Sequence, residues 1–320
     1  MIHQTWLNLI KDAPNQFNTS HPQQLDLIGI GINKYKTYNT GKVIYTGLTR
    51  DAMADRDALA ALGELLVFEV HHGLRLLEQI RSAEEEWVKV KMLLPGYAGK
   101  SDEAQTKRIS NLMTRMTSQI EGWLDAEDMW SKDKVTGLMR KTCGADTRAA
   151  GASSTEVDNH CGWNNGSQDR NCARASLQTD MSVVAKAAGF AKDFQEHHHL
   201  GRAAVPVPRA WYDALLPGLT TLLDTMSSLP CGVAETLQCI ELSVQAYWQA
   251  LPIKMLKYGQ DFQPQQLTAV QDVMNTDAYA EFATEVGQAE LDSMEKFGLK
   301  VPYLSEWADE QAASKRPAEG

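Results

Sequence analysis

The stretch "TRDAMADRDALAALGELLVFEVHHGLRLLEQIRSAEEEW", from Thr49 to Trp87, decides the predicted fold. Its aliphatic residues recur every three or four positions, at 59, 62, 66, 70, 74, 77 and 80. An α-helix turns once in 3.6 residues, so this spacing places them on one helical face. Thr49 is the expected N-cap, with Asp51 in the first turn. The stretch therefore predicts a long amphipathic helix that ends before Pro95, and its Gly63 and Gly73 permit a neighbouring helix to approach closely.

Helical spacing continues through most of the remaining chain. Ser101 is the expected N-cap of a second long helix, and further helices are predicted near residues 173–200, 209–226, 232–258 and 264–297. Five prolines are expected to divide this half into shorter pieces: Pro206, Pro208, Pro217, Pro230 and Pro252. The predicted fold class is all-α, a multi-helix bundle forming a single helical domain over residues 1–312, with a disordered tail at 313–320.

The segment between residues 25 and 48 differs from this pattern. Leu25–Ile32 and Lys42–Leu48 are short and rich in isoleucine, valine and tyrosine, and a polar stretch with Asn39, Thr40 and Gly41 separates them. Such runs are typical of paired strands. We expect a small N-terminal β-hairpin or extended arm, with strand limited to this segment.

Charge and hydropathy argue against a nucleic-acid partner and against a membrane-spanning segment. The net charge is -10 and the isoelectric point is about 5.3, which disfavours nucleic acid because phosphate binding needs a basic face. No segment approaches the roughly 18 consecutive apolar residues of a membrane span. The first residues, "MIHQTWLNLIKDAPNQF", do not have the pattern of a signal peptide, which favours the cytoplasm or a virion.

Three of the five cysteines lie in a polar stretch of about thirty residues. Cys143, Cys161 and Cys172 stand among glycine, serine and asparagine, whereas buried structural thiols usually have apolar neighbours. We expect a solvent-exposed loop over 143–172 with at least two of these cysteines cross-linked; free thiols, or zinc with His160, remain open, although no C-x-x-C pair is present. The sequons at Asn18 and Asn165 agree with a mature extracytoplasmic chain, so localisation is left open.

Two E-x-x-H pairs suggest a metal site. Glu69 with His72, and Glu196 with His199, each place a carboxylate and an imidazole one helical turn apart. Two such pairs and two further carboxylates form the di-iron or di-manganese site of some helical bundles. The candidates for those further ligands are Glu121 or Glu127 and Glu235 or Glu241.

A structural interpretation competes with the metal site. In "FQEHHHLGR", Gly201 follows the histidines, and glycine after the last periodic residue is typical of a helix C-terminus. Consecutive residues are spread around a helix, so His197, His198 and His199 cannot all face one metal. No helix carrying a glutamate is predicted before Glu69, as the usual bundle order requires. We therefore expect a helix end at these histidines and keep the metal site as the alternative.

Two further motifs fail on inspection. "PGYAGKS", from Pro95 to Ser101, ends like a phosphate-binding loop, but the required first glycine is Leu94. Asp51, Asp55 and Asp57 have a spacing similar to the magnesium-binding aspartates of isoprenoid synthases, but no second aspartate-rich motif accompanies them. We expect these aspartates to lie in a solvated first turn.

The sequence thus indicates a binding or assembly protein of a structural, surface, secretion-apparatus or virion type, acting through a protein partner or self-assembly. No catalytic residue and no cofactor is assigned in this interpretation. The alternative is a non-haem oxidoreductase that holds an Fe or Mn pair at Glu69, His72, Glu196 and His199.

Overall fold

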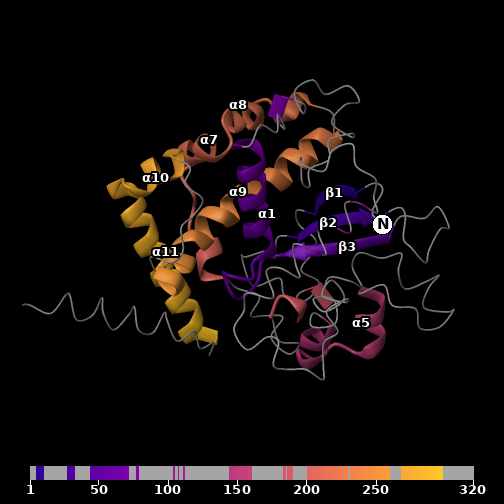
Figure 1. Cartoon of the computed structure of the whole chain (residues 1–320). Helices are drawn as coiled ribbons and strands as arrows, with labels where there is room; N and C mark the ends of the chain where they lie inside the picture. Colours follow the sequence, from indigo (N-terminus) through magenta and orange to yellow (C-terminus); the bar gives the residue numbers. More distant parts are fainter. Residues whose placement is uncertain are drawn as a thin grey trace, which may run out of the picture. The chain divides into compact units, whose positions relative to one another are not determined.

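The structure is a computed structural model, and it describes only part of the chain. The described residues are 5–10, 27–32, 44–71, 77–78, 104, 107, 111, 144–160, 183–184, 186–189, 200–229, 231–259 and 268–297. They are predominantly helical, with one small sheet (Figure 1), so the predicted fold class is confirmed. Among them, no helix combines the length and hydropathy needed to cross a membrane. The predicted tail at 313–320 lies outside these residues.

The sheet has three strands, β1 (Thr5–Ile10), β2 (Leu27–Ile32) and β3 (Ile44–Thr49), in the order β1-β2-β3. β2 and β3 fall in the predicted arm. The expectation that strand is limited to residues 25–48 was wrong, because β1 lies earlier in the chain. Its sequence, TWLNLI, is a short apolar run of a length typical of strands.

The chain divides into two compact units. The first contains Met1–Trp6, Gly31–Thr46 and Lys91–Lys192, and the second contains Leu7–Ile30, Gly47–Val90 and Asp193–Gly320. A compact unit is not by itself an independently folding domain, so the single domain over 1–312 stays a prediction.

Helix α1 (Ala58–His71) begins nine residues later than Thr49, its predicted N-cap. Thr49 ends β3 instead, and Asp57 caps the helix by accepting hydrogen bonds from the backbone N–H groups of Leu59 and Ala60. Between them the chain makes a turn closed by the Arg56 N–H and the Met53 carbonyl, at 3.0 Å. The sequence pattern located the helix correctly but placed its start in a strand.

Helix α1 packs against α9 (Cys231–Tyr258), the long helix that crosses the second unit (Figure 1). The expected close approach occurs at Gly63, where a Cβ atom would lie 2.2 Å from the carbonyl oxygen of Ser243. Pro252 lies inside α9 and does not end it, contrary to the expectation that this proline divides the chain. Of the second long helix that was predicted, Ala104, Lys107 and Asn111 are described, and they are helical.

Shorter elements complete the second unit. They are η6 (Gly201–Ala204), η7 (Arg209–Trp211), α7 (Tyr212–Leu215), α8 (Leu219–Asp224), η8 (Met226–Ser228), α10 (Thr268–Met274) and α11 (Asp277–Phe297). The helix predicted over 209–226 is divided before Leu219 at Gly218, which has φ 87°. The helix predicted over 264–297 is divided as well, because Thr276 caps α11 by accepting a hydrogen bond from the N–H of Tyr279, 3.2 Å away.

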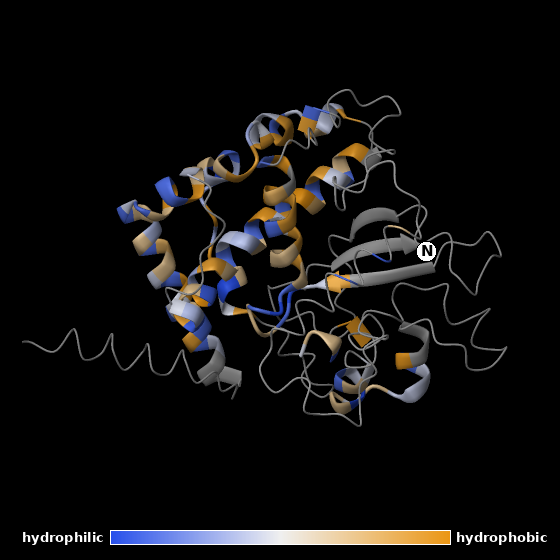
Figure 2. Ribbon diagram, in the orientation of Figure 1, coloured by the Kyte–Doolittle hydropathy of each residue, from blue (hydrophilic) through white to orange (hydrophobic). Residues whose placement is uncertain are grey.

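Aromatic rings from η7, α9 and α11 pack against one another in the second unit. Trp211 of η7 lies 5.3 Å from Trp248 of α9 and 5.1 Å from Phe282 of α11 between ring centroids. The indole N–H of Trp248 reaches the Trp211 carbonyl at 3.3 Å, so its polar atom is satisfied. Figure 2 shows hydrophobic and hydrophilic residues together along α10 and α11, as expected of helices with one buried face.

The predicted cysteine loop contains two helices in its described part, residues 144–160. Residues 144–149 and α5 (Ser154–His160) are helices within 143–172, and Thr147 and Val157 are buried. The loop was therefore a wrong prediction for this part, whereas the expected solvent exposure holds for many of its described residues, such as Asp146, Arg148 and Ser154. The reason for the helix α5 is a capping box: Ser153 Oγ accepts from the Glu156 N–H at 3.3 Å, while Glu156 Oε2 accepts from the Ser153 N–H at 2.7 Å.

The helix predicted near 173–200 does not run unbroken. Lys186 and Ala187 are helical, but the chain turns at Ala188 and Gly189, and Gly189 has φ 86°. Left-handed backbone at a glycine is the common way to end a helix. Gly189 was not singled out in the sequence. The helix end expected at His197, His198 and His199 lies outside the described residues and stays a prediction, and Gly201 opens η6.

Candidate functional site

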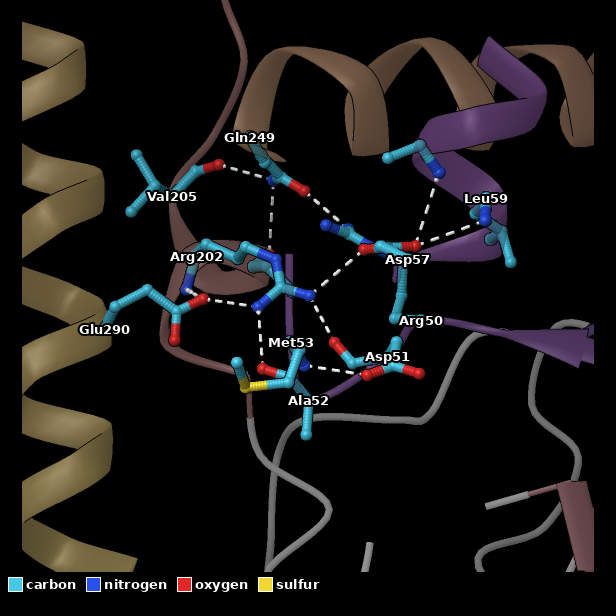
Figure 3. A network of polar contacts seen from close by, with 12 residues as sticks. Arg50, Asp51, Ala52, Met53, Asp57, Leu59, Arg202, Val205, Gln249 and Glu290 are labelled. Atoms are coloured by element: carbon cyan, nitrogen blue, oxygen red, sulfur yellow. Dashed lines mark hydrogen bonds and ion pairs between the residues drawn. The ribbon is translucent and has the colours of Figure 1, made fainter. Parts of the chain in front are cut away.

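Five side chains from distant parts of the second unit meet in one buried cluster. We call Arg50, Asp57, Arg202, Gln249 and Glu290 the charge clamp (Figure 3). They come from the chain after β3, the start of α1, η6, α9 and α11, respectively. All five are buried, with residue exposures between 1 and 6 %. Isolated charges cannot be buried this deeply at low cost, so their pairing decides whether the cluster is stable.

Arg202 is the centre of the charge clamp. Its Nη1 donates to Glu290 Oε1 at 2.6 Å, and its Nη2 donates to Asp57 Oδ2 at 3.1 Å. The same guanidinium donates to the main-chain carbonyls of Asp51 and Ala52. The planar fork of an arginine can serve several acceptors at once, which a lysine ammonium cannot do with the same geometry. Arg202 thereby ties η6 to α11 and to the turn before α1.

Arg50 completes the charge clamp from the other side of Asp57. Its Nε donates to Asp57 Oδ2 at 2.6 Å, and its Nη1 donates to Gln249 Oε1 at 2.7 Å. Gln249 in turn donates from Nε2 to the Val205 carbonyl at 2.7 Å. Asp57 therefore accepts from two arginines through one oxygen and caps α1 through the other.

The protonation preferences follow from these partners. Burial alone would raise the pKa of Asp57, but the charges of Arg50 and Arg202 and their hydrogen bonds hold it below its ordinary value. Burial lowers the pKa of Arg50, which faces one carboxylate and a neutral amide. The pKa of Arg202 is raised against the same burial effect, because Glu290 and Asp57 both stabilise its charge. These shifts favour the ionised forms of Asp57 and Arg202.

Two donors of the charge clamp have no hydrogen-bond partner among the described residues. They are Arg50 Nη2 and Arg202 Nε, both buried. Each unmade hydrogen bond of a buried group costs about 1–3 kcal/mol, so the clamp is not optimal for stability alone. The ion pair between Lys257 and Asp55 is more exposed than those of the charge clamp: Lys257 Nζ lies 2.5 Å from Asp55 Oδ2, and the Lys257 side chain is 28 % exposed.

Asp51 lies beside the charge clamp. Its Oδ1 accepts from the N–H of Met53 at 2.8 Å, and its Oδ2 lies 3.6 Å from Nε of the half-exposed Arg56. Burial raises the pKa of Asp51 to about 6, although the Met53 hydrogen bond, Arg56 and Arg202 all act to lower it. The solvated first turn expected for Asp51, Asp55 and Asp57 was therefore a wrong prediction for Asp51 and Asp57, which are buried because they bind the backbone and arginines.

The structure tests little of the predicted metal site. Glu69 belongs to α1, but its side chain is not among those described, and His72, Glu196 and His199 lie outside the described residues. Glu121 and Glu127 lie outside them too, whereas Glu235 and Glu241 are half-buried on α9. Within the part of the chain that is described, histidine, cysteine and carboxylate side chains form no group of three that could hold a metal.

The structure does not test the three cysteines that were predicted to form a disulfide. Cys143, Cys161 and Cys172 lie outside the described residues, so their cross-linking stays a prediction. Cys239 on α9 is a free, buried thiol. Burial, followed by the nearby charge of Glu235, raises its pKa to about 12, which leaves the thiol protonated and unreactive at neutral pH.

Inspection of the sequence missed the charge clamp. Arg202 was quoted only as the residue after a helix end, and Arg50 only as part of a helix start. The pattern D-A-L-A at Asp57–Ala60, an N-cap residue before an apolar periodic run, could have located the true start of α1. Nothing local could have paired residues 50 and 57 with 202, 249 and 290.

The charge clamp is an architectural arrangement: its charges neutralise one another and are closed to solvent, which holds five segments in a fixed relation. Comparison with known proteins adds no assignment to this geometry, since no protein-family model, no curated protein and no solved structure matches the chain.

Proposed function

We propose that this chain is a structural assembly protein that joins to a second copy of itself through the open edge of β3. The observation that carries the proposal is the strand order, in which β3 has a strand neighbour, β2, on one side only among the described residues. An edge strand offers a row of backbone donors and acceptors that another strand can pair with.

The anchoring of β3 supports this role. The strand leads directly into Arg50 and Asp51, and Arg50 is fixed by Asp57 and Gln249. A strand whose end is tied to a rigid helical body loses little further freedom when it pairs with a neighbour, so less of the binding energy is spent on ordering it.

The test is the mass of the full chain in solution, measured by light scattering after size exclusion over a range of concentrations. Assembly through β3 predicts dimers or larger species. It is best examined with the matched variants Thr46→Pro and Gly47→Pro, because successive N–H groups of a strand point to opposite sides. One of these variants removes a donor to β2 and the other removes a donor at the open edge.

We expect the variant that loses the donor at the open edge to keep the circular-dichroism spectrum of the wild type and to become monomeric. The other variant is expected to lose stability. A wild-type chain that is monomeric at every concentration would overturn the proposal, as would two variants that are both folded and both assembled.

The oxidoreductase alternative has its own test. Protein purified without chelators would be analysed for iron and manganese, together with Glu69→Ala and His72→Ala. A bound metal pair that both substitutions abolish would favour the Fe or Mn enzyme; metal-free protein that regains none on incubation with Fe(II) or Mn(II) would exclude it.

A further inference from the structure

The turn that joins β3 to α1 contains a buried carboxylate that no buried cation pairs with among the residues the structure describes. The Asp51 side chain is 9 % exposed, and Arg56, its ion-pair partner within the described part of the chain, lies 3.6 Å away and is 50 % exposed. Exposed arginines stabilise a carboxylate weakly, because water screens the interaction. Arg202 bonds to the main-chain carbonyl of Asp51, not to its carboxylate.

Among the described residues, the buried charges beside Asp51 balance without its carboxylate. Arg50 and Arg202 supply two positive charges, and Asp57 and Glu290 already supply two negative ones through direct ion pairs. The charged groups that act on Asp51 are Arg56 from its own turn, Arg202 from η6 and Asp57 from the start of α1. Asp57 repels an ionised Asp51 less than Arg56 and Arg202 attract it, so the burial of the carboxylate is what disfavours its ionised form.

We propose that Asp51 is a proton-controlled latch, which holds the turn between β3 and α1 closed when its carboxyl group is protonated and loosens the turn when it ionises. The neutral form still accepts the Met53 hydrogen bond through Oδ1 and avoids the cost of burying a charge, the largest effect on this group. The turn is bound to Arg202 through the carbonyls of Asp51 and Ala52, so its loosening reaches the charge clamp.

The direction of the pH effect follows from the two states. The pKa of Asp51 is about 6 in the folded chain, against an ordinary aspartate pKa of 3.8, so the folded state binds the proton more tightly. The stabilisation is fully present below pH 3.8 and is lost as the pH rises through about 6. This is opposite to the usual behaviour of paired carboxylates, so the latch has a recognisable signature.

The experiment uses the full chain as wild type, Asp51→Asn and the control Asp272→Asn, an exposed residue of α10. Asparagine keeps the acceptor for Met53 but cannot ionise. Between about pH 5 and pH 7.5 we expect the folding constant of the wild type to fall about tenfold more than that of Asp51→Asn. Asp272→Asn should follow the wild type. Equal pH dependence in all three proteins would overturn the latch.

Two further measurements on the wild type keep the proposal testable even where Asp51→Asn does not fold. The carboxyl carbon of Asp51, followed by NMR, should titrate near pH 6; a midpoint near 4 would overturn the proposal. Amide exchange of residues 51–57, corrected for the intrinsic pH effect, should be faster at pH 7.5 than at pH 5. Exchange that is unchanged there would remove the proposed loosening.

Discussion

Two arginines of the second unit make ion pairs of nearly the same length and very different consequence. Arg202 lies 2.6 Å from Glu290 with 1 % of its side chain exposed, and Arg209 lies 2.7 Å from Asp224 with 51 % exposed. The Arg202 pair joins α11 to η6 in the core, whereas the Arg209 pair lies at the surface. Water replaces a broken surface pair but cannot reach a buried one, so burial decides what each pair contributes.

The largest expected effect tests this contrast directly. Arg202→Met leaves Asp57 and Glu290 buried without their shared cation and should lower the free energy of unfolding by about 3–5 kcal/mol. Arg209→Met should change it by less than about 1 kcal/mol. Urea denaturation of both variants measures the difference. Comparable losses in the two proteins would contradict the importance of burial.

Two substitutions of Asp57 distinguish the contribution of its ion pairs to stability from the contribution of its helix cap. Asp57→Asn keeps an acceptor for the Leu59 and Ala60 N–H groups but removes the charge, and should cost about 3 kcal/mol. Asp57→Ala removes the cap as well and should cost about 1 kcal/mol more. The same denaturation experiment reports both. A harmless Asp57→Asn would show that the residue acts as a cap alone.

Close backbone contact next to Arg202 gives the third prediction. A Cβ at Gly201 would lie 1.9 Å from the Ala289 carbonyl oxygen, so Gly201→Ala must push η6 away from α11. We expect a loss of about 2–3 kcal/mol, the upper range for overpacking. The matched control is Gly259→Ala, where a Cβ meets nothing within 4 Å and φ is 56°. Its left-handed strain should cost about 1 kcal/mol. Thermal or urea melts that reverse this order would refute the contact.

The smallest effect is expected in the first unit, at the capping box of α5. Glu156→Ala should cost about 1 kcal/mol through loss of the reciprocal cap. The pKa of Glu156 is lowered: burial opposes this, but the hydrogen bonds to Ser153 and the charge of Lys186 outweigh it. Its contribution is therefore present above the ordinary glutamate pKa of 4.5 and is lost as the pH falls through the lower folded value. Stability of the variant relative to wild type, measured from pH 3 to 7, should converge at the acid end. The pH dependence is thus opposite to that expected of Asp51.

Several features of the fold could be predicted from the residues alone. The apolar spacing of Leu59, Leu62 and Leu66 located the helix that became α1, and Gly63 indicated its close neighbour. The helix predicted over 232–258 agrees with α9 to within one residue. The strands β2 and β3 were expected from short segments rich in isoleucine, valine and tyrosine. These are properties of periodicity, which depends on residues a few positions apart.

Element ends were predicted less well. Thr49 and the segment 143–172 each matched a general pattern that a stronger local interaction displaced: Asp57 for the cap and Ser153 with Glu156 for the helix start. Each competitor was visible in the sequence. Choosing between them requires knowing which side chains have other partners, and that depends on the rest of the fold.

By itself, the sequence determined that the chain is acidic, that its described part is mainly helical, and that a small strand region lies near its start. These three properties follow from composition and short-range spacing. Only the tertiary structure decided that Arg50, Asp57, Arg202, Gln249 and Glu290 meet, and that Asp51 is enclosed beside them. The physical reason is that a charged residue has no preferred partner at a distance of 150 or 200 positions. Its partner is set by how apolar faces pack, and burial then makes the resulting pairing costly to break.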